Sequence, residues 1–456
     1  MSAGFRTGIA AEMDVDVEST YPSAFTVDNC TKVAEGKTKA ILTIPDSDHV
    51  VVQSKDKITA FNAERQHDLE GKAHLSNVTT SLVFQYLNSI GLRTHFVRMH
   101  TSTEFIAMRC VMIPIEWVAR RLATGSFLKR HPNVSEGYRF SPPKVELFYK
   151  DDALGDPEWS REMLIESGLV VSGVTIQAKE VDLMIEVTRT VFEILERAWE
   201  SAGCTLVDLK VEFGVHVITG DIILADVIDS DSWRLWPGGD KRLQVDKQFY
   251  RDLPVVTEED LSTLMNKFSW VVEQLKKFTP PAKSRVVVFL GSDKDTECGE
   301  KIRTCLQKLG IHCDLRIASA HKGAVETLKI LAEYEGHLVP TVYIAVAGRS
   351  NGLGPILSGS TSNPVINCPP VEDASSLQDV WSSLRLPSGI GCATVLSPEA
   401  AALHAASILG LQDHYVWSRL RLNRLLNYIS LMKADWKSRR DNDLKRDMVC
   451  RGTLEN

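Results

Sequence analysis

Short apolar and β-branched runs alternate with one long helical pattern in the first 273 residues. Residues 49–54 (HVVVQS) and 221–229 (DIILADVID) have the pattern of strands, whereas residues 181–203 repeat apolar positions with a helical period. This mixture predicts an α+β domain with much antiparallel sheet over residues 25–273. Residues 1–24 show no period, and we expect a disordered lead-in there.

The pattern changes after residues 274–284 (QLKKFTPPAKS), where a Pro-Pro step predicts an extended linker. Continuous apolar runs then alternate with helical segments, as in β-α-β units whose strands are covered on both faces. Residues 285–456 are therefore predicted to form a three-layer α/β/α domain with a parallel, flavodoxin-like sheet and C-terminal helices, strongly helical over residues 399–436. A chain of 456 residues is long enough for two such domains.

Composition narrows the classes of function. The formal net charge of −7 gives no positive field for nucleic acid, so a nucleic-acid partner is not expected. The chain contains no run of about 18 apolar residues, so no membrane span is predicted. The nine cysteines include no C-x-x-C pair, which argues against zinc and a disulfide framework. The acidic N-terminus resembles no secretory or transit signal, and we expect a cytoplasmic, cytosolic protein that acts on small molecules.

Basic residues suited to anions occur twice in the first domain. Gly36-Lys37-Thr38-Lys39 lies between strand-like segments, where glycine admits a close ligand and the lysines reach phosphates, although such a turn is more often merely solvated. In residues 116–130 (EWVARRLATGSFLKR) arginines precede a Gly-Ser step, a pattern that favours an anionic substrate over a plain basic helix face.

Acidic residues follow on two later segments. In LVDLKVEFG, residues 206–214, Asp208, Lys210 and Glu212 share one strand face because side chains alternate along a strand. The next segment, residues 223–236, adds Asp226, Asp229 and Asp231. Carboxylates beside phosphate-binding cations suit Mg²⁺, whereas the spacing of an EF-hand calcium loop is absent.

These segments resemble the signatures of SAICAR synthetases, which use ATP and Mg²⁺ to join carboxyaminoimidazole ribonucleotide (CAIR) to L-aspartate through an acyl phosphate. The similarity covers about residues 30–265 and departs from the family pattern at Ala34 and Asn62. Such chemistry requires no protein nucleophile. The resemblance implies these roles: ATP contacts for Lys37 and Lys39, metal binding for Glu212 and Asp226, CAIR binding for Arg120, Ser126 and Arg234, and neutralisation of phosphate charge for Lys210.

Three polar loops in the second domain each follow a predicted strand, at the sheet edge where parallel sheets bind ligands. They are residues 291–295 (GSDKD), 319–322 (SAHK) and 347–355 (AGRSNGLGP). His321 at a strand end can exchange a proton near neutral pH, a use that we favour over a core histidine. The third loop has three glycines and one arginine, but no dinucleotide fingerprint, so NAD is not expected.

Together the three loops resemble class II aminoimidazole ribonucleotide (AIR) carboxylases, which take CO₂ directly without ATP or biotin. The similarity covers about residues 285–420, and Asp293 departs from it. The resemblance implies three groups of residues: Ser292 and Asp295 at the ribose phosphate, Ser319, His321 and Lys322 around the imidazole and CO₂, and Gly348, Arg349 and Ser350 completing the site.

The order of the two halves resembles animal bifunctional enzymes of purine synthesis, which implies a homo-octamer built around the carboxylase domains. Two other interpretations fit the sequence less well. A ligase fused to a nucleotide-sugar or dehydrogenase-like domain is disfavoured by the SAHK loop. A catalytically inactive, metabolite-binding scaffold is disfavoured by the presence of Lys37, Glu212, Asp226 and His321.

Overall fold

The computed structural model describes residues 29–61, 64–279, 284–371 and 374–452. The predicted lead-in at residues 1–24, Asn62 and part of the predicted linker lie outside these residues. The chain divides into two compact units, one of residues 1–278 with 422–456 and one of residues 279–421. None of the described helices combines the length and the apolar character needed to cross a membrane.

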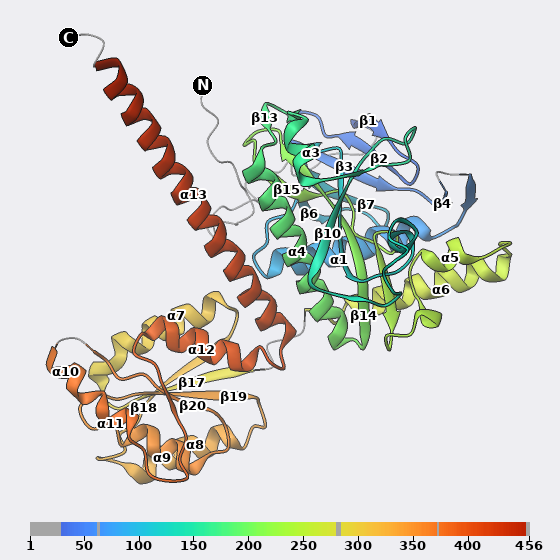
Figure 1. The fold of residues 1–456 in the computed structure, drawn as a ribbon. Helices are drawn as coiled ribbons and strands as arrows, with labels where there is room; N and C mark the ends of the chain where they lie inside the picture. Colours follow the sequence, from blue (N-terminus) through green and yellow to red (C-terminus); the bar gives the residue numbers. More distant parts are fainter. Residues whose placement is uncertain (1–28, 62–63, 280–283, 372–373, 453–456) are drawn as a thin grey trace. The chain divides into compact units, whose positions relative to one another are not determined.

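The first unit is built on two antiparallel sheets (Figure 1). The smaller has the order β1-β2-β3-β7-β6, with β1 Thr31–Glu35, β2 Lys39–Thr43, β3 His49–Ser54, β7 Glu104–Met108 and β6 Phe96–Met99. The larger has the order β11-β10-β9-β14-β15, with β16 and β8 also paired to β14. Its strands are β11 Glu158–Trp159, β10 Arg139–Tyr149, β9 Ile115–Leu122, β14 Cys204–His216, β15 Ile222–Ala225, β16 Trp233–Pro237 and β8 Cys110–Met112.

Among the residues described up to 278, two small hairpins and six α-helices complete this unit. The hairpins are β4 Lys57–Ala60 with β5 Arg65–Asp68, and β12 Val170–Val171 with β13 Val174–Thr175. The helices are α1 Lys72–Ser89, α2 Ser126–Arg130, α3 Arg161–Glu166, α4 Ala178–Ser201, α5 Gln248–Asp252 and α6 Glu258–Leu275. Capping boxes at Gln177 and Thr257 begin α4 and α6, because each satisfies backbone N–H groups that the first helical turn leaves unpaired. The predicted α+β domain is confirmed.

The second unit holds a parallel sheet of order β18-β17-β19-β20, extended by the short β21. The strands are β17 Arg285–Leu290, β18 His312–Ile317, β19 Thr341–Val346, β20 Val365–Asn367 and β21 Ala393–Thr394. The helices are α7 Thr296–Lys308, α8 Ala324–Glu335, α9 Leu353–Ser360, α10 Ala374–Asp379, α11 Trp381–Leu384 and α12 Pro398–Leu409. The predicted three-layer fold is confirmed.

Alternate residues of β17 explain why the parallel strands read as continuous apolar runs. Val286 and Val288 pack with side chains of α7 and α12, whereas Val287 and Phe289 pack with side chains of α8 and α9. Figure 1 shows the helices on the two faces of this sheet. Both faces are therefore buried, and no polar alternation remains.

The final helix, α13 His414–Gly452, extends beyond residue 436. Its residues up to 421 group with the second unit and those from 422 with the first. The predicted helical tail consists of two helices, α12 and α13.

Candidate active sites

Strand β14 carries the acidic and basic residues predicted for phosphoryl chemistry. The ammonium group of Lys210 donates to Glu116 at 3.1 Å and to Glu212 at 2.7 Å. Lys150 donates to the other oxygen of Glu212 at 2.9 Å. Glu212 is buried, so its charge is neutralised by two lysines instead of by water. The sequence pattern indicated Lys210 and Glu212 but not Lys150, because Lys150 lies 62 positions before Glu212 along the chain.

Asp226 reaches the same centre from the end of β15. Ala225 pairs with Glu212 across the β14–β15 ladder, and Asp226 is the next residue along the chain. Its backbone has φ of 66°, a left-handed conformation that turns the chain at the strand end. Lys39 forms an ion pair with Asp226, whereas Lys37 is exposed and pairs with Asp152 at 3.2 Å. The two lysines of the G-K-T-K segment therefore have different surroundings.

Charge coupling holds this centre in its ionised state. Burial opposes the charged form of Glu212, but Lys210, Lys150 and Lys39 outweigh it and lower the pKa of Glu212 to about 2. Burial, aided by the charges of Lys210 and Lys150, lowers the pKa of Lys39 to about 8 despite the attraction of Glu212. At neutral pH the centre thus presents carboxylates surrounded by ammonium groups.

Glu212 and Asp226 could hold Mg²⁺, because both carboxylates interact with Lys39 and carboxylate oxygens are the hard ligands that this ion prefers. The surrounding lysines suit the phosphates that a bound Mg²⁺ would bridge. Among the described residues, the one group of three metal-ligating side chains within mutual reach is His131, Glu146 and Glu158. Arg130 donates to both carboxylates of that group, which makes it a poor cation site.

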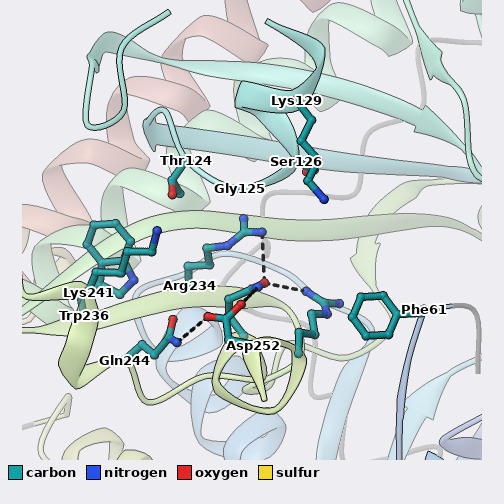
Figure 2. Close-up of a pocket in the computed structure, with 12 residues that line it drawn as sticks. Phe61, Thr124, Gly125, Ser126, Lys129, Arg234, Trp236, Lys241, Gln244 and Asp252 are labelled. Atoms are coloured by element: carbon teal, nitrogen blue, oxygen red, sulfur yellow. Dashed lines mark hydrogen bonds between the residues drawn. The ribbon is translucent and has the colours of Figure 1, made fainter. Parts of the chain in front are cut away.

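A cavity of about 620 Å³ with several cationic lining residues lies beside β16. Figure 2 shows Gly125, Ser126 and Lys129 on one side and Arg234 on the other. Gly125 has φ of 59°, and a Cβ there would come within 2.7 Å of Nη2 of Arg234. Glycine suits this position because a φ of 59° lies in the left-handed region, which residues with a Cβ rarely adopt. The cationic lining residues are Lys129, Arg234, Lys241 and Arg251.

A second cavity, of about 320 Å³, shares Ser126 and Arg234 with the first cavity and extends to Lys210 on β14. It is lined by Arg120, Ser126, Asp208, Lys210 and Arg234 among others. Arg120 is 3% exposed and donates to Asp208 at 2.7 Å, and Arg234 pairs with the same carboxylate. The structure therefore brings together the three residues predicted to bind CAIR, and Asp208 links the two arginines.

The two acidic residues left undecided by the sequence have different surroundings. Asp231 lines the second cavity and accepts from Lys247 at 3.0 Å and from Lys72 at 3.4 Å. Asp229 accepts from the backbone N–H of Asp231 at 2.9 Å and so shapes the turn. Asp231 is therefore the one that we propose to contact substrate.

The three loops predicted in the second unit lie at the carboxyl ends of the adjacent strands β18, β17 and β19. A Cβ on Gly291 would lie 3.3 Å from Cβ of Ala347, which places the first loop against the third. A Cβ on Gly352 would lie 3.1 Å from the ring of His321, which places the second loop against the third. The histidine therefore lies where the loops meet.

Within the loops, hydroxyl groups fix the turns. Ser292 accepts from the backbone N–H of Lys294 at 3.0 Å, and Asp295 begins α7. Ser319 accepts from the backbone N–H of Lys322 at 3.3 Å. Both serines thus hold their loops in shape, while His321 and Lys322 remain exposed at the sheet edge.

The third loop is held by a buried amide network that the sequence did not indicate. Asn351 donates to Asn367 at 3.0 Å and to Ser383 at 2.9 Å, and it accepts from the backbone N–H of Gly354. Next to it, Arg349 has φ of 56°, an uncommon conformation for this residue type. Gly348, Arg349 and Ser350 follow the buried strand β19 after one residue, Ala347. Partners 16 and 32 residues away cannot be identified from local pattern.

The close approach at Gly352 gives a testable prediction. We expect Gly352→Ala to lower the rate of the reaction at this site by about 3- to 10-fold, because the His321 ring must move by a few tenths of an ångström and a displacement of about 1 Å can cost about 100-fold. Gly352 has φ of −79°, which alanine adopts without strain, so the effect would come from the displaced His321 ring. The control is Gly323→Ala in the second loop, where a Cβ meets nothing closer than 3.9 Å. Equal rates for the two variants would contradict this geometry.

An antiparallel unit with a carboxylate–lysine centre, joined to a parallel unit with a histidine loop site, defines a two-domain enzyme. The family model for SAICAR synthetase matches residues 32–266, and that for AIR carboxylase matches residues 285–427. The chain is 57% identical to multifunctional protein ADE2 of Gallus gallus, over 90% of this chain and 96% of that protein. It is 56% identical to the Homo sapiens bifunctional phosphoribosylaminoimidazole carboxylase/phosphoribosylaminoimidazole succinocarboxamide synthetase, over 90% of this chain and 97% of that protein.

A solved SAICAR synthetase in complex with ADP is 32% identical, with a TM-score of 0.48, and aligns with 55% of this chain and 100% of that one. The chain belongs to the family of bifunctional AIR carboxylase/SAICAR synthetases. This confirms the resemblance inferred from the sequence.

Proposed function

We propose that the chain carries out two consecutive steps of de novo purine synthesis. The second unit carboxylates AIR with CO₂ to give CAIR, and the first unit joins CAIR to L-aspartate with ATP to give SAICAR. The observation that carries this proposal is the pair of separate sites, one on β14–β16 and one on the loops after β17, β18 and β19. Their chemistry differs, as the two reactions require.

Ligation begins with activation of the CAIR carboxylate, which is a poor electrophile. A carboxylate oxygen attacks the γ-phosphorus of ATP, ADP leaves, and the resulting acyl phosphate is attacked by the amine of aspartate with loss of phosphate. Ser126, Arg120 and Arg234 would bind the ribonucleotide in the two connected cavities. Lys37 and Lys39 would contact ATP, and Lys210 would offset charge on the transferring phosphoryl group. Mg²⁺ held by Glu212 and Asp226 would supply charge neutralisation for the phosphates.

Carboxylation uses the loops of the second unit. Ser292 and Asp295 would bind the ribose phosphate, and Gly348, Arg349 and Ser350 would close around the ligand. Ser319 and Lys322 would orient the imidazole and CO₂. The ring carbon adds to CO₂, and His321 then removes the ring proton, which restores aromaticity.

Fusion of the two activities raises the local concentration of CAIR at the synthetase site. We further propose that the protein acts in the cytosol as a homo-octamer built around its carboxylase domains. Neither biotin nor NAD has a part in this chemistry, and nucleic acids and membranes are not partners.

The acyl phosphate can be tested with CAIR labelled with ¹⁸O in its carboxylate. We expect one labelled oxygen to appear in the inorganic phosphate for each SAICAR formed, because phosphate leaves with an oxygen that belonged to the carboxylate. Mass spectrometry of the released phosphate makes the measurement, and a reaction without aspartate is the control. Unlabelled phosphate accompanying SAICAR formation would contradict the mechanism.

A further inference from the structure

Asp246 is a fully buried carboxylate that joins two walls of the larger cavity. Its Oδ2 accepts from the backbone N–H of Leu235 on β16 at 2.7 Å, and its Oδ1 accepts from the backbone N–H of Gln248 on α5 at 2.8 Å. The backbone N–H of Val245 donates to the carbonyl of Leu235 at 3.1 Å. Asp246 therefore fixes the start of α5 against the edge of β16.

Both joined elements carry side chains of the cavity. Arg234 precedes Leu235 on β16, and α5 carries Gln248 and Arg251. Arg234 and Arg251 each donate to the side-chain oxygen of Gln248 at 3.5 Å. The spacing between the two guanidinium groups thus depends on the junction that Asp246 makes.

The carboxyl group of Asp246 gains or loses its proton near neutral pH. Burial raises the pKa of Asp246 to about 7, although the two backbone N–H groups and the charge of Arg234 favour ionisation. Asp208, on the neighbouring strand β14, raises this pKa further. From α6, Lys267 faces the same region and donates to the carbonyl of Gln244 at 2.6 Å. Arg234 is the charge that the bound ligand would alter.

We propose that Asp246 is a positioning residue of the synthetase site that acts through Arg234 and α5, and that it takes up a proton when a phosphorylated ribonucleotide fills the cavity. The inference rests on the proposed function of this cavity. An anion beside Arg234 offsets the positive charge that helps to keep Asp246 ionised. Binding therefore favours the protonated carboxyl group, and by linkage protonation favours binding.

Ligand affinity should fall as pH rises through the pKa of Asp246. Well below pH 7, Asp246 is protonated with or without ligand, and affinity is at its highest. As pH rises above 7, the empty site loses its proton first, so binding requires proton uptake and affinity falls. Each unit by which the ligand raises the pKa of Asp246 weakens binding by about tenfold at high pH.

The test is calorimetric binding of SAICAR to the full-length protein between pH 6 and 9, in buffers of different ionisation enthalpy. We expect the wild-type protein to take up protons near pH 7.5 and to lose affinity above it. Asp246→Asn keeps the side-chain size but removes the titration, so its proton uptake should vanish. The matched control, Asp240→Asn, removes a partly exposed acid from the same segment and should behave as wild type. Ionisation of the SAICAR phosphate contributes equally to all three proteins and therefore cancels in the comparison.

Equal proton uptake by wild type and a folded Asp246→Asn variant would overturn the proposal. So would the absence of proton uptake in the wild type, a result that decides the matter even if the variant does not fold. Failure of SAICAR to bind the wild type at any pH would overturn the proposed function of the cavity as well. SAICAR binding to the wild type without proton uptake would overturn only the proposed role of Asp246.

Discussion

Replacing His321 with asparagine should lower AIR carboxylation by about 10²- to 10⁴-fold, the usual contribution of a general acid–base group. Asparagine can donate and accept hydrogen bonds but cannot exchange a proton at neutral pH. His321 is exposed in the loop after β18, so its replacement leaves the sheet core unchanged. The measurement is the rate of CAIR formation from AIR and bicarbonate, followed beside the rate of SAICAR formation from supplied CAIR.

The second of these rates should stay at the wild-type value. A control variant, His312→Asn, changes an exposed histidine at the opposite end of the same strand, where it bonds to Asp314 at 3.0 Å. It should keep both activities. If His321→Asn lost ligation together with carboxylation, the assignment of two independent sites would be wrong.

Asp226→Asn should have the reverse effect and lower ligation by about 10²- to 10³-fold, the typical cost of removing one electrostatic contact with developing charge. Asparagine is unusually tolerant of the left-handed backbone that Asp226 adopts at φ of 66°. The substitution therefore changes the charge facing Lys39 and the nucleotide while it keeps the turn after β15. Carboxylation should be unaffected.

A matched variant at the other end of β15 separates loss of charge from loss of fold. Asp221→Asn removes a carboxylate that lies 3.5 Å from Arg93, and both activities should survive it. Steady-state rates with CAIR, L-aspartate and Mg-ATP make the comparison. A ligation rate for Asp226→Asn within a few-fold of wild type would remove Asp226 from the proposed metal centre.

Most of the fold followed from the sequence where the signal was local. The apolar run of β17 predicted a strand buried on both faces, and the long period over residues 181–203 predicted α4. Strands of two residues, such as β12 and β21, carry too little pattern to be recognised. The continuation of α13 to Gly452 lies in a charged segment without an apolar stripe that would have marked its end.

In the candidate sites, too, local sequence pattern indicates which residues share a strand face or a loop, but not which distant segments meet. Motifs such as LVDLKVEFG place Lys210 and Glu212 on one strand face through local alternation. The ion pair between Lys39 and Asp226, by contrast, joins residues 187 positions apart. The titration proposed for Asp246 depends on burial, which the polar sequence around it did not indicate.

The central claim, that one chain performs two consecutive reactions, is tested most directly by absorbance. Purified protein receives AIR and bicarbonate, and L-aspartate with Mg-ATP is added afterwards. We predict two successive spectral changes, the first independent of ATP and the second dependent on both aspartate and ATP. A single change that appears only when CAIR is supplied would contradict the carboxylase assignment and leave the second unit without its proposed role.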